Sequence, residues 1–151
     1  MDVTQLPFNR LVGLETGASG SGFLVCLPDG PQYTNHLGTV HAGALLAVAE
    51  AGSGAFLMQQ FGSGVGFVPV VRRLEAKFRK PARGRISARC PVELQEVERW
   101  SAELAARGRV LAPITVELVD DAGVIVLSAL VEWFIARAGE NAERKGASAD
   151  I

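Results

Sequence analysis

One ionisable side chain stands alone in a long apolar stretch of this chain. Between Gly30 and Val71 the only formal charge belongs to Glu50, which lies inside the run of small and apolar residues over 42–58. Burying a lone carboxylate is costly unless a partner compensates it. Either a residue from another segment neutralises Glu50, or its raised proton affinity serves a reaction, as base or nucleophile.

Groups that could stabilise an attacked carbonyl precede the same run. If 42–58 is helical, its first turn at 40–43 presents backbone N–H groups without intrahelical partners, at the positive end of the helix dipole. Such a turn can hold an oxyanion. Asn35 adds an amide in the preceding loop, where it either contacts the carbonyl or stitches the loop. We expect His41 to orient the helix entry through a hydrogen bond, and His36 to be a loop residue.

Helix geometry limits how these two sets of groups can cooperate. Eight residues separate Ala42 from Glu50, which is about 12 Å at about 1.5 Å per residue. A base or nucleophile must come within about 3 Å of the reacting atom. The helix start and Glu50 of one chain therefore cannot act on the same carbon, but two antiparallel helices from two chains can. We expect a two-fold homodimer with two composite sites, alone or within a dimer of dimers.

Two helices are predicted from the hydrophobic pattern. Apolar continuity indicates a buried helix that runs from a Thr39 N-cap to about residue 60 and is closed by the glycine-rich segment 61–64. A shorter amphipathic helix is expected over 94–107, with Gly108 as its C-cap. The apolar positions of this second helix include Leu94, Val97, Ala102 and Leu104.

Alternating apolar and polar residues predict strands, and the order of elements predicts their arrangement. One strand precedes the long helix, two follow it, and a hairpin through 120–123 joins two more after the short helix. The last strand is apolar on both faces, which requires cover on both sides. We expect an α+β protein whose antiparallel sheet wraps around the long helix. The strands are expected at 19–27, 68–78, 86–90, 110–119 and 124–136.

Composition indicates a single soluble domain. The chain has 151 residues and a net charge of −1, so no basic field points to nucleic acid. Cys26 and Cys90 lack metal-ligand spacing and are expected to be reduced, and two histidines do not suggest a metal site. A charge at the centre of 42–58 argues against a membrane span, and the first residues do not resemble a signal peptide. We expect one cytoplasmic domain over 1–137 and a flexible tail over 138–151.

The stretch from Asn35 through the segment GTVHAGA at 38–44 to Glu50 resembles the motif of hotdog-fold acyl-CoA thioesterases. The similarity is to the branch that includes phenylacetic-acid-pathway thioesterases, and it covers about residues 19–137. It implies a hotdog fold and hydrolysis of a small or medium acyl or aryl thioester of CoA. It implies no metal and no cofactor, because the CoA moiety is part of the substrate.

The resemblance also assigns roles to the residues of the motif. Glu50 would attack the thioester carbonyl or activate a water, and the amide N–H of Ala42 would hold the oxyanion. Asn35 would bond the carbonyl or position the water, and Ser53 would orient Glu50 or the water. The family usually has glycine where this chain has Ala42, so the added methyl group narrows the approach. The candidate catalytic residues are Asn35, His41, Ala42, Gly43, Glu50 and Ser53.

Basic residues around one predicted turn could bind the phosphates of CoA, or could simply keep that turn solvated. Two other functions remain open. A hotdog dehydratase or hydratase would use His36, fourteen residues before Glu50, although the Pro-Gly helix entry of those enzymes is missing. A module that binds acyl-CoA without turnover would need no catalytic acid. The basic candidates are Arg79, Lys80, Arg83 and Arg85.

Overall fold

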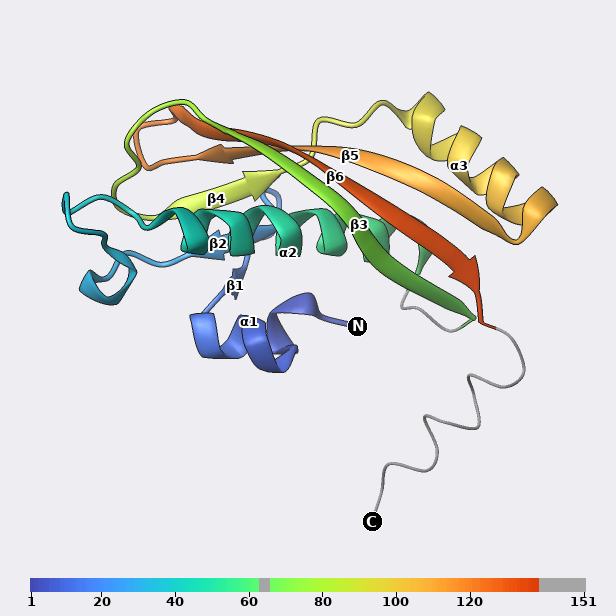
Figure 1. Cartoon of the computed structure of the whole chain (residues 1–151), viewed down its shortest axis with the longest axis horizontal. Helices are drawn as coiled ribbons and strands as arrows, with labels where there is room; N and C mark the ends of the chain where they lie inside the picture. The colour runs from blue at the N-terminus through green and yellow to red at the C-terminus, as the bar shows by residue number, and fades with distance from the viewer. Residues whose placement is uncertain (63–65, 139–151) are drawn as a thin grey trace, which may run out of the picture.

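A curved antiparallel sheet wraps around one long helix, α2 (Ala42–Phe61), in the computed structural model of the chain (Figure 1). The structure describes residues 1–62 and 66–138. The six strands lie in the order β1-β2-β4-β5-β6-β3, and every neighbouring pair is antiparallel. The predicted α+β arrangement is therefore confirmed. The strands are β1 (Glu15–Thr16), β2 (Val25–Leu27), β3 (Phe67–Phe78), β4 (Ile86–Arg89), β5 (Arg109–Val119) and β6 (Ile125–Arg137).

Helix α2 is apolar on all sides because other elements cover most of its surface. Val48 and Ala49 are fully buried, and the helix contacts β2, β4, β5 and β6 on its sheet side. It is long and apolar enough by composition to cross a bilayer, but here it is the core helix of the fold. Its C-cap is Gly62, and the rest of the predicted closing segment, at 63–64, lies outside the described residues.

The predicted N-cap of α2 is wrong by two residues. The helix is capped by His41, whose Nδ1 accepts a hydrogen bond from the backbone N–H of Gly43 at 2.9 Å. Thr39 cannot serve because the chain stays extended beyond it. The backbone N–H of Val40 donates to the carbonyl of Ala82 at 2.8 Å, so Val40 is held in the extended segment before the helix.

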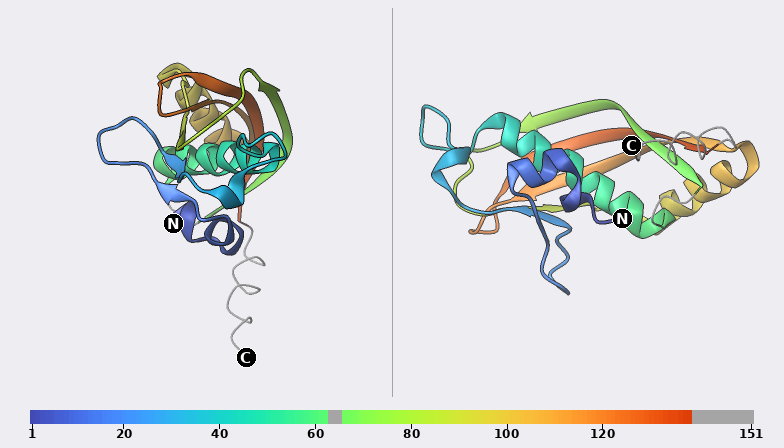
Figure 2. Two further views of the ribbon diagram at one scale, coloured as in Figure 1. Left: turned by 90° about the vertical axis from the view of Figure 1, so that its left-hand side faces the viewer. Right: turned by 90° about the horizontal axis from the view of Figure 1, so that it is seen from below.

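The first predicted strand is also shorter than expected. Only Val25–Leu27 of the segment 19–27 pairs with β4. Gly20 and Gly22 have positive φ angles of 75° and 78°, which bend the chain away from a strand. Upstream, η1 (Val3–Gln5) and α1 (Pro7–Val12) were not predicted, and they pack on the side of α2 away from the sheet (Figure 2).

Helix α3 (Leu94–Arg107) has the predicted bounds and the predicted Gly108 C-cap, but its apolar face differs. Leu94 is 69% exposed and Ala102 is also exposed. The buried positions are Val97, Trp100 and Leu104. Their spacing of three and four residues places them on one helical face, whereas Leu94 lies in the first turn, beyond that contact.

Strand β6 is buried on the face toward α2 and only partly covered on the other. Leu127 and Val131 are fully buried, whereas Leu130 on the opposite face is 40% exposed. The predicted cover of both faces of this strand is thus incomplete in the single chain.

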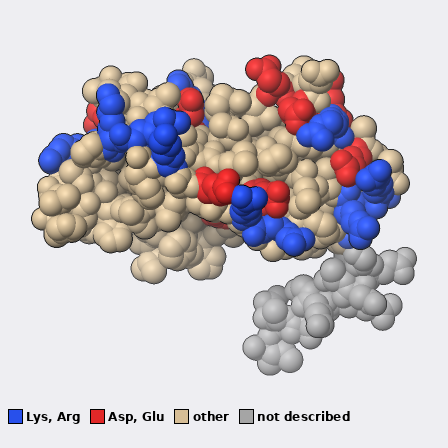
Figure 3. Space-filling view, turned by 45° about the horizontal axis from the view of Figure 1, so that its top comes forward, with Lys and Arg blue, Asp and Glu red and all other residues tan. Residues whose placement is uncertain are grey.

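Across the outer face shown in Figure 3, basic groups are separated by acidic groups and uncharged surface. Strand β3 ends the sheet, and Val68 and Val70 along it are exposed.

Candidate functional site

Glu50 lies in the third turn of α2, half-buried, and opens onto an apolar cavity of about 430 Å³. None of the ion pairs among residues 1–62 and 66–138 involves it. Burial raises the pKa of its carboxyl above the usual 4.5, and no compensating charge opposes this effect. Of the two expectations for this acid, the neutralising partner is not found among residues 1–62 and 66–138. The cavity is lined by Met1, Val3, Leu6, Asn9, Glu50, Ala51, Gly54, Leu57, Met58, Pro69, Val70, Val71 and Trp133.

Ser53 is fully buried beside Glu50, but its hydroxyl has other partners than expected. The Ser53 Oγ donates to the backbone carbonyl of Glu50 at 2.7 Å and accepts from the Trp133 indole Nε1–H at 2.9 Å. It therefore ties α2 to β6. Ser53 was expected to orient Glu50 or the attacking water, and the contact that its hydroxyl makes with Glu50 is to the main-chain carbonyl.

The start of α2 leaves one amide available for a ligand. The N–H of His41 donates to the carbonyl of Tyr33 at 2.7 Å, and the N–H of Gly43 donates to the His41 imidazole. No described group accepts from the N–H of Ala42, which is exposed at the first position of the helix. His41 thus takes the orienting position that the sequence suggested. Gly43, a candidate oxyanion donor, has its amide engaged in the cap.

Asn35 lies near this helix start and holds its own loop together. Its Nδ2 donates to Thr39 Oγ1 at 2.9 Å, and its Oδ1 accepts from the backbone N–H groups of Leu37 at 2.9 Å and Thr39 at 3.1 Å. These contacts agree with the expectation that Asn35 holds its own loop together. The side chain also lines a cavity of about 340 Å³ together with Ala42. His36 in the same loop is exposed and does not line the Glu50 cavity.

Two of the four basic candidates border the cavity at the helix start. Arg79 and Lys80 line it together with Ala42 and the aromatic ring of Phe78. Arg79 Nε also donates to Ser128 Oγ at 2.6 Å, which holds the guanidinium against the sheet. Both residues are exposed, so their side chains stay in contact with solvent beside this cavity.

The other two basic candidates have structural partners. Arg83 Nη1 donates to the carbonyl of Gly38 at 2.8 Å and so supports the loop that carries Asn35. Arg85 forms an ion pair with Glu15 at 2.8 Å, between the start of β4 and the edge strand β1. The structure thus divides the basic group into a pair beside Ala42 and a pair that holds loops.

The two halves of the predicted site line different cavities of the protomer. Glu50 opens toward η1, α1 and β3, whereas Ala42 opens toward Pro81 and the end of β3. This separation agrees with the distance along α2 that the sequence predicted. A single protomer therefore offers an acid at one place and an amide donor at another.

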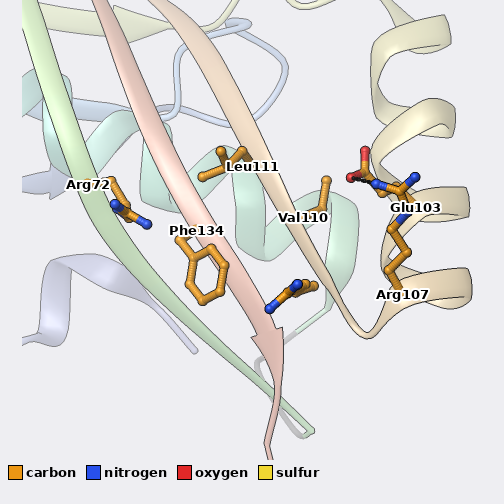
Figure 4. Close-up of a pocket in the computed structure, with 7 residues that line it drawn as sticks. Arg72, Glu103, Arg107, Val110, Leu111 and Phe134 are labelled. Carbon is orange, nitrogen blue, oxygen red and sulfur yellow. Dashed lines mark hydrogen bonds and ion pairs between the residues drawn. The ribbon is translucent and has the colours of Figure 1, made fainter.

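A more voluminous hollow, of about 640 Å³, lies on the sheet face away from α2, beside α3 (Figure 4). There Arg72 lies over the ring of Phe134, 6.0 Å from its centroid, and Arg107 pairs with Glu103 at 3.5 Å. No candidate residue from the sequence lines this hollow. We place the candidate site at Glu50 because that cavity holds an uncompensated acid.

Asn9 is a polar residue of the Glu50 cavity that sequence reasoning missed. It belongs to α1, is 4% exposed, and lines the cavity with Glu50. Helix α1 has six residues, too few for a hydrophobic period to indicate which of them face inward. The sequence alone therefore gives no sign that the Asn9 side chain lines a cavity.

Solved structures share this fold. The Pseudomonas aeruginosa protein PA5026, named a protein of unknown function and probable thioesterase, has a TM-score of 0.75 at 24% identity, covering 90% of this chain and 91% of that one. The Bacillus halodurans protein BH2602, solved with CoA, has a TM-score of 0.64 at 21% identity, covering 85% and 74%. The Staphylococcus aureus thioesterase SAV0944, as a mutant, has a TM-score of 0.62 at 13% identity, covering 85% and 98%.

These likenesses identify the fold as the hotdog fold. No curated protein matches the chain in sequence. Residues 16–135 match the family model described as Domain of unknown function (DUF4442), which is most of the chain. This protein therefore belongs to the DUF4442 family, with a hotdog fold.

Proposed function

We propose that this protein hydrolyses a small or medium acyl or aryl thioester of CoA, with the Glu50 carboxylate as the catalytic base or nucleophile. The observation that carries the proposal is the half-buried Glu50 carboxyl, which has no ion-pair partner among the described residues and opens onto an apolar cavity. Burial of such a group costs stability, which function can justify. The names of the similar structures support the same reaction class, because one is a thioesterase and another was solved with CoA.

The proposed reaction is acyl transfer to water. Glu50 takes a proton from a water molecule whose oxygen attacks the thioester carbon, or its carboxylate attacks that carbon first and water then cleaves the anhydride. The oxyanion is stabilised by the free N–H of Ala42 at the positive end of α2. The carbon–sulfur bond breaks, and the thiolate of CoA leaves and is protonated. The products are a carboxylic acid and CoA, and the reaction uses no metal or organic cofactor.

The proposed active form is a two-fold dimer in which Glu50 of one protomer faces Ala42 of its partner. Two observations support it. Glu50 and Ala42 line separate cavities in one protomer. Strand β3 is a twelve-residue sheet edge with exposed apolar side chains, which is a template for pairing with a second copy. The dimer can pair again into a tetramer through the outer sheet face.

The CoA moiety is proposed to bind at the helix start. Arg79 and Lys80 border the Ala42 cavity and would pair with phosphates. Phe78, 49% exposed in the same cavity, offers an aromatic face to the adenine or pantetheine groups. Arg83 and Arg85 are proposed to act indirectly, by holding the surrounding loops.

Release of free thiol from a panel of acyl-CoA and aryl-CoA substrates tests this function. We expect turnover with at least one small or medium substrate, and a loss of at least about 100-fold in kcat for Glu50→Ala. Arg72→Gln, in the hollow on the other sheet face, is the matched control and should retain the rate. Enoyl-CoA hydration without thiol release would favour a hydratase, and tight binding unaffected by Glu50→Gln without turnover would favour a binding module.

A further inference from the structure

The cavity below Glu50 contains few polar groups. Of its thirteen lining residues, Glu50 and Asn9 alone carry an amide or carboxyl side chain. The indole N–H of Trp133 is already bonded to Ser53. Met1, which is 60% exposed, lies at the rim. An acyl group in this space would therefore meet apolar walls, the catalytic acid and one amide.

The amide of Asn9 is held in a defined orientation. Its Nδ2 donates to the backbone carbonyl of Val3 at 2.8 Å, and a carbonyl can only accept. The Oδ1 of Asn9 is therefore the atom left as an acceptor. Among the described residues, none donates to it, although the residue is only 4% exposed. The Asn9 Oδ1 atom nevertheless keeps some access to solvent. Among the described side-chain nitrogen and oxygen atoms, Trp100 Nε1 is the one that is both inaccessible to solvent and without a hydrogen-bond partner.

An acceptor that no described protein group pairs with favours a ligand that brings a donor. A plain alkyl chain placed against Asn9 would exclude water from its Oδ1 and supply no hydrogen bond. An acyl group with a hydroxyl at the same place would satisfy the oxygen. Sites that hydrogen-bond a substrate hydroxyl discriminate strongly against the analogue that lacks it, since the protein group is then left unpaired.

We propose that Asn9 is a specificity-determining residue that selects acyl groups carrying a hydroxyl over alkyl groups of the same length. The hydroxyl donates to Asn9 Oδ1 while the rest of the acyl group contacts the apolar walls that Val3, Leu6 and Trp133 provide. This inference rests on the proposed function, and it adds the substrate class. The N-terminal segment η1–α1, which packs over the middle of α2 (Figure 2), is then a wall of the acyl site.

The test compares hexanoyl-CoA with 3-hydroxyhexanoyl-CoA and 6-hydroxyhexanoyl-CoA on the full chain. We expect kcat/KM for at least one hydroxylated substrate to exceed that for hexanoyl-CoA by about tenfold or more. In Asn9→Leu this preference should fall to less than about twofold, mainly through KM for the hydroxylated substrate. In Met58→Leu, a volume-conserving change in the same cavity, both rates should change together and the preference should remain.

Two results would overturn the inference. One is equal kcat/KM for all three substrates in the natural sequence, a comparison that needs no variant to fold. The other is an equal loss of kcat for all substrates in Asn9→Leu, because Asn9 would then hold the attacking water instead.

Failure of the proposed function is distinguishable from failure of the inference. If no thioester is hydrolysed, the affinities of hexanoyl and hydroxyhexanoyl thioether analogues of CoA are compared by calorimetry. Tighter binding of a hydroxylated analogue, lost in Asn9→Leu, would support the selection by Asn9 although the hydrolase proposal had failed. Equal binding of the analogues would overturn the selection as well.

Discussion

At the scale of single residues, the proton affinity of Glu50 connects burial to chemistry. The side chain is half-buried among apolar groups, and burial raises its pKa because the charged form loses contact with water. No described cation restores the charged form. A base with a raised pKa accepts a proton more strongly, so the surroundings that cost stability also make Glu50 a better base.

The pH dependence of hydrolysis should follow the ionisation of Glu50. The reaction needs the carboxylate, so kcat/KM should fall as the pH is lowered through the pKa of Glu50 in the folded protein. Because that pKa is raised, the acid limb should lie above pH 4.5. A rate profile from pH 4 to pH 8 measures it, with circular dichroism at each pH as the control for folding. A profile that stays flat below pH 4.5 would contradict this role.

Glu50 should also lower the stability of the fold at neutral pH. A carboxyl with a raised folded-state pKa binds its proton more tightly in the folded than in the unfolded chain, so folding becomes less favourable as the pH rises through this window. We expect Glu50→Gln to increase the free energy of unfolding at pH 7 by about 1 kcal/mol. The increase should shrink toward pH 4. Urea denaturation at the two pH values tests this, and a destabilised Glu50→Gln protein would show that the acid is structural.

At the scale of elements, the fit of α2 against the sheet depends on a glycine. A Cβ added at Gly52 would lie 2.7 Å from the Cβ of Ala88 on β4, closer than two such atoms can approach. A Cβ at Gly54 would meet the Trp133 ring at 3.6 Å, an ordinary contact. The two positions lie in the same helix and differ in the space they have.

This difference predicts opposite effects of the same substitution. Gly52→Ala should lower the free energy of unfolding by about 1–3 kcal/mol, because α2 or β4 must shift to relieve the overlap. Gly54→Ala should leave it unchanged or raise it by up to about 1 kcal/mol, through helix propensity. Denaturation curves of the two variants provide the comparison. Equal destabilisation would mean that α2 does not approach β4 as closely as the structure places it.

The sequence predicted best those elements that have a sustained hydrophobic pattern or a clear terminating residue or turn. Helix α3 was bounded by its amphipathic pattern and Gly108, and the β5–β6 hairpin by alternation on both sides of its turn. Glu50 was recognised as a candidate site residue because a lone acidic residue in an apolar helix is visible in the sequence itself. The His41 cap was missed because its cause, an extended segment that pairs with Ala82, is a long-range contact. Asn9 was missed for a similar reason, since its partner and its cavity exist only in the folded chain.

For the whole molecule, the proposed catalysis requires two chains. The acid and the free amide of one protomer line different cavities, and β3 leaves a long edge of the sheet uncovered. A two-fold partner would cover that edge and bring its own helix start toward Glu50. The proposed function then depends on the association of two chains, and an active monomer would contradict it.

Ala42 offers a way to remove the amide donor without breaking the helix. It is the first residue of α2, a position that proline accepts. The preceding residue, His41, already has φ −63° and ψ 138°, in the region that proline requires of its neighbour. Ala42→Pro should therefore fold and lose about 100-fold in kcat, the usual cost of one oxyanion donor.

Mixing two inactive variants tests the composite site most directly. Glu50→Gln and Ala42→Pro chains, each nearly inactive alone, are unfolded together and refolded as mixed dimers. Half of the dimers should be hybrids, and each hybrid should contain one intact site, so thiol release should recover to about a quarter of the natural rate. Refolding each variant alone is the control. No recovery in dimers shown to be hybrid would mean that both groups act within one chain, which would contradict a site shared between two chains.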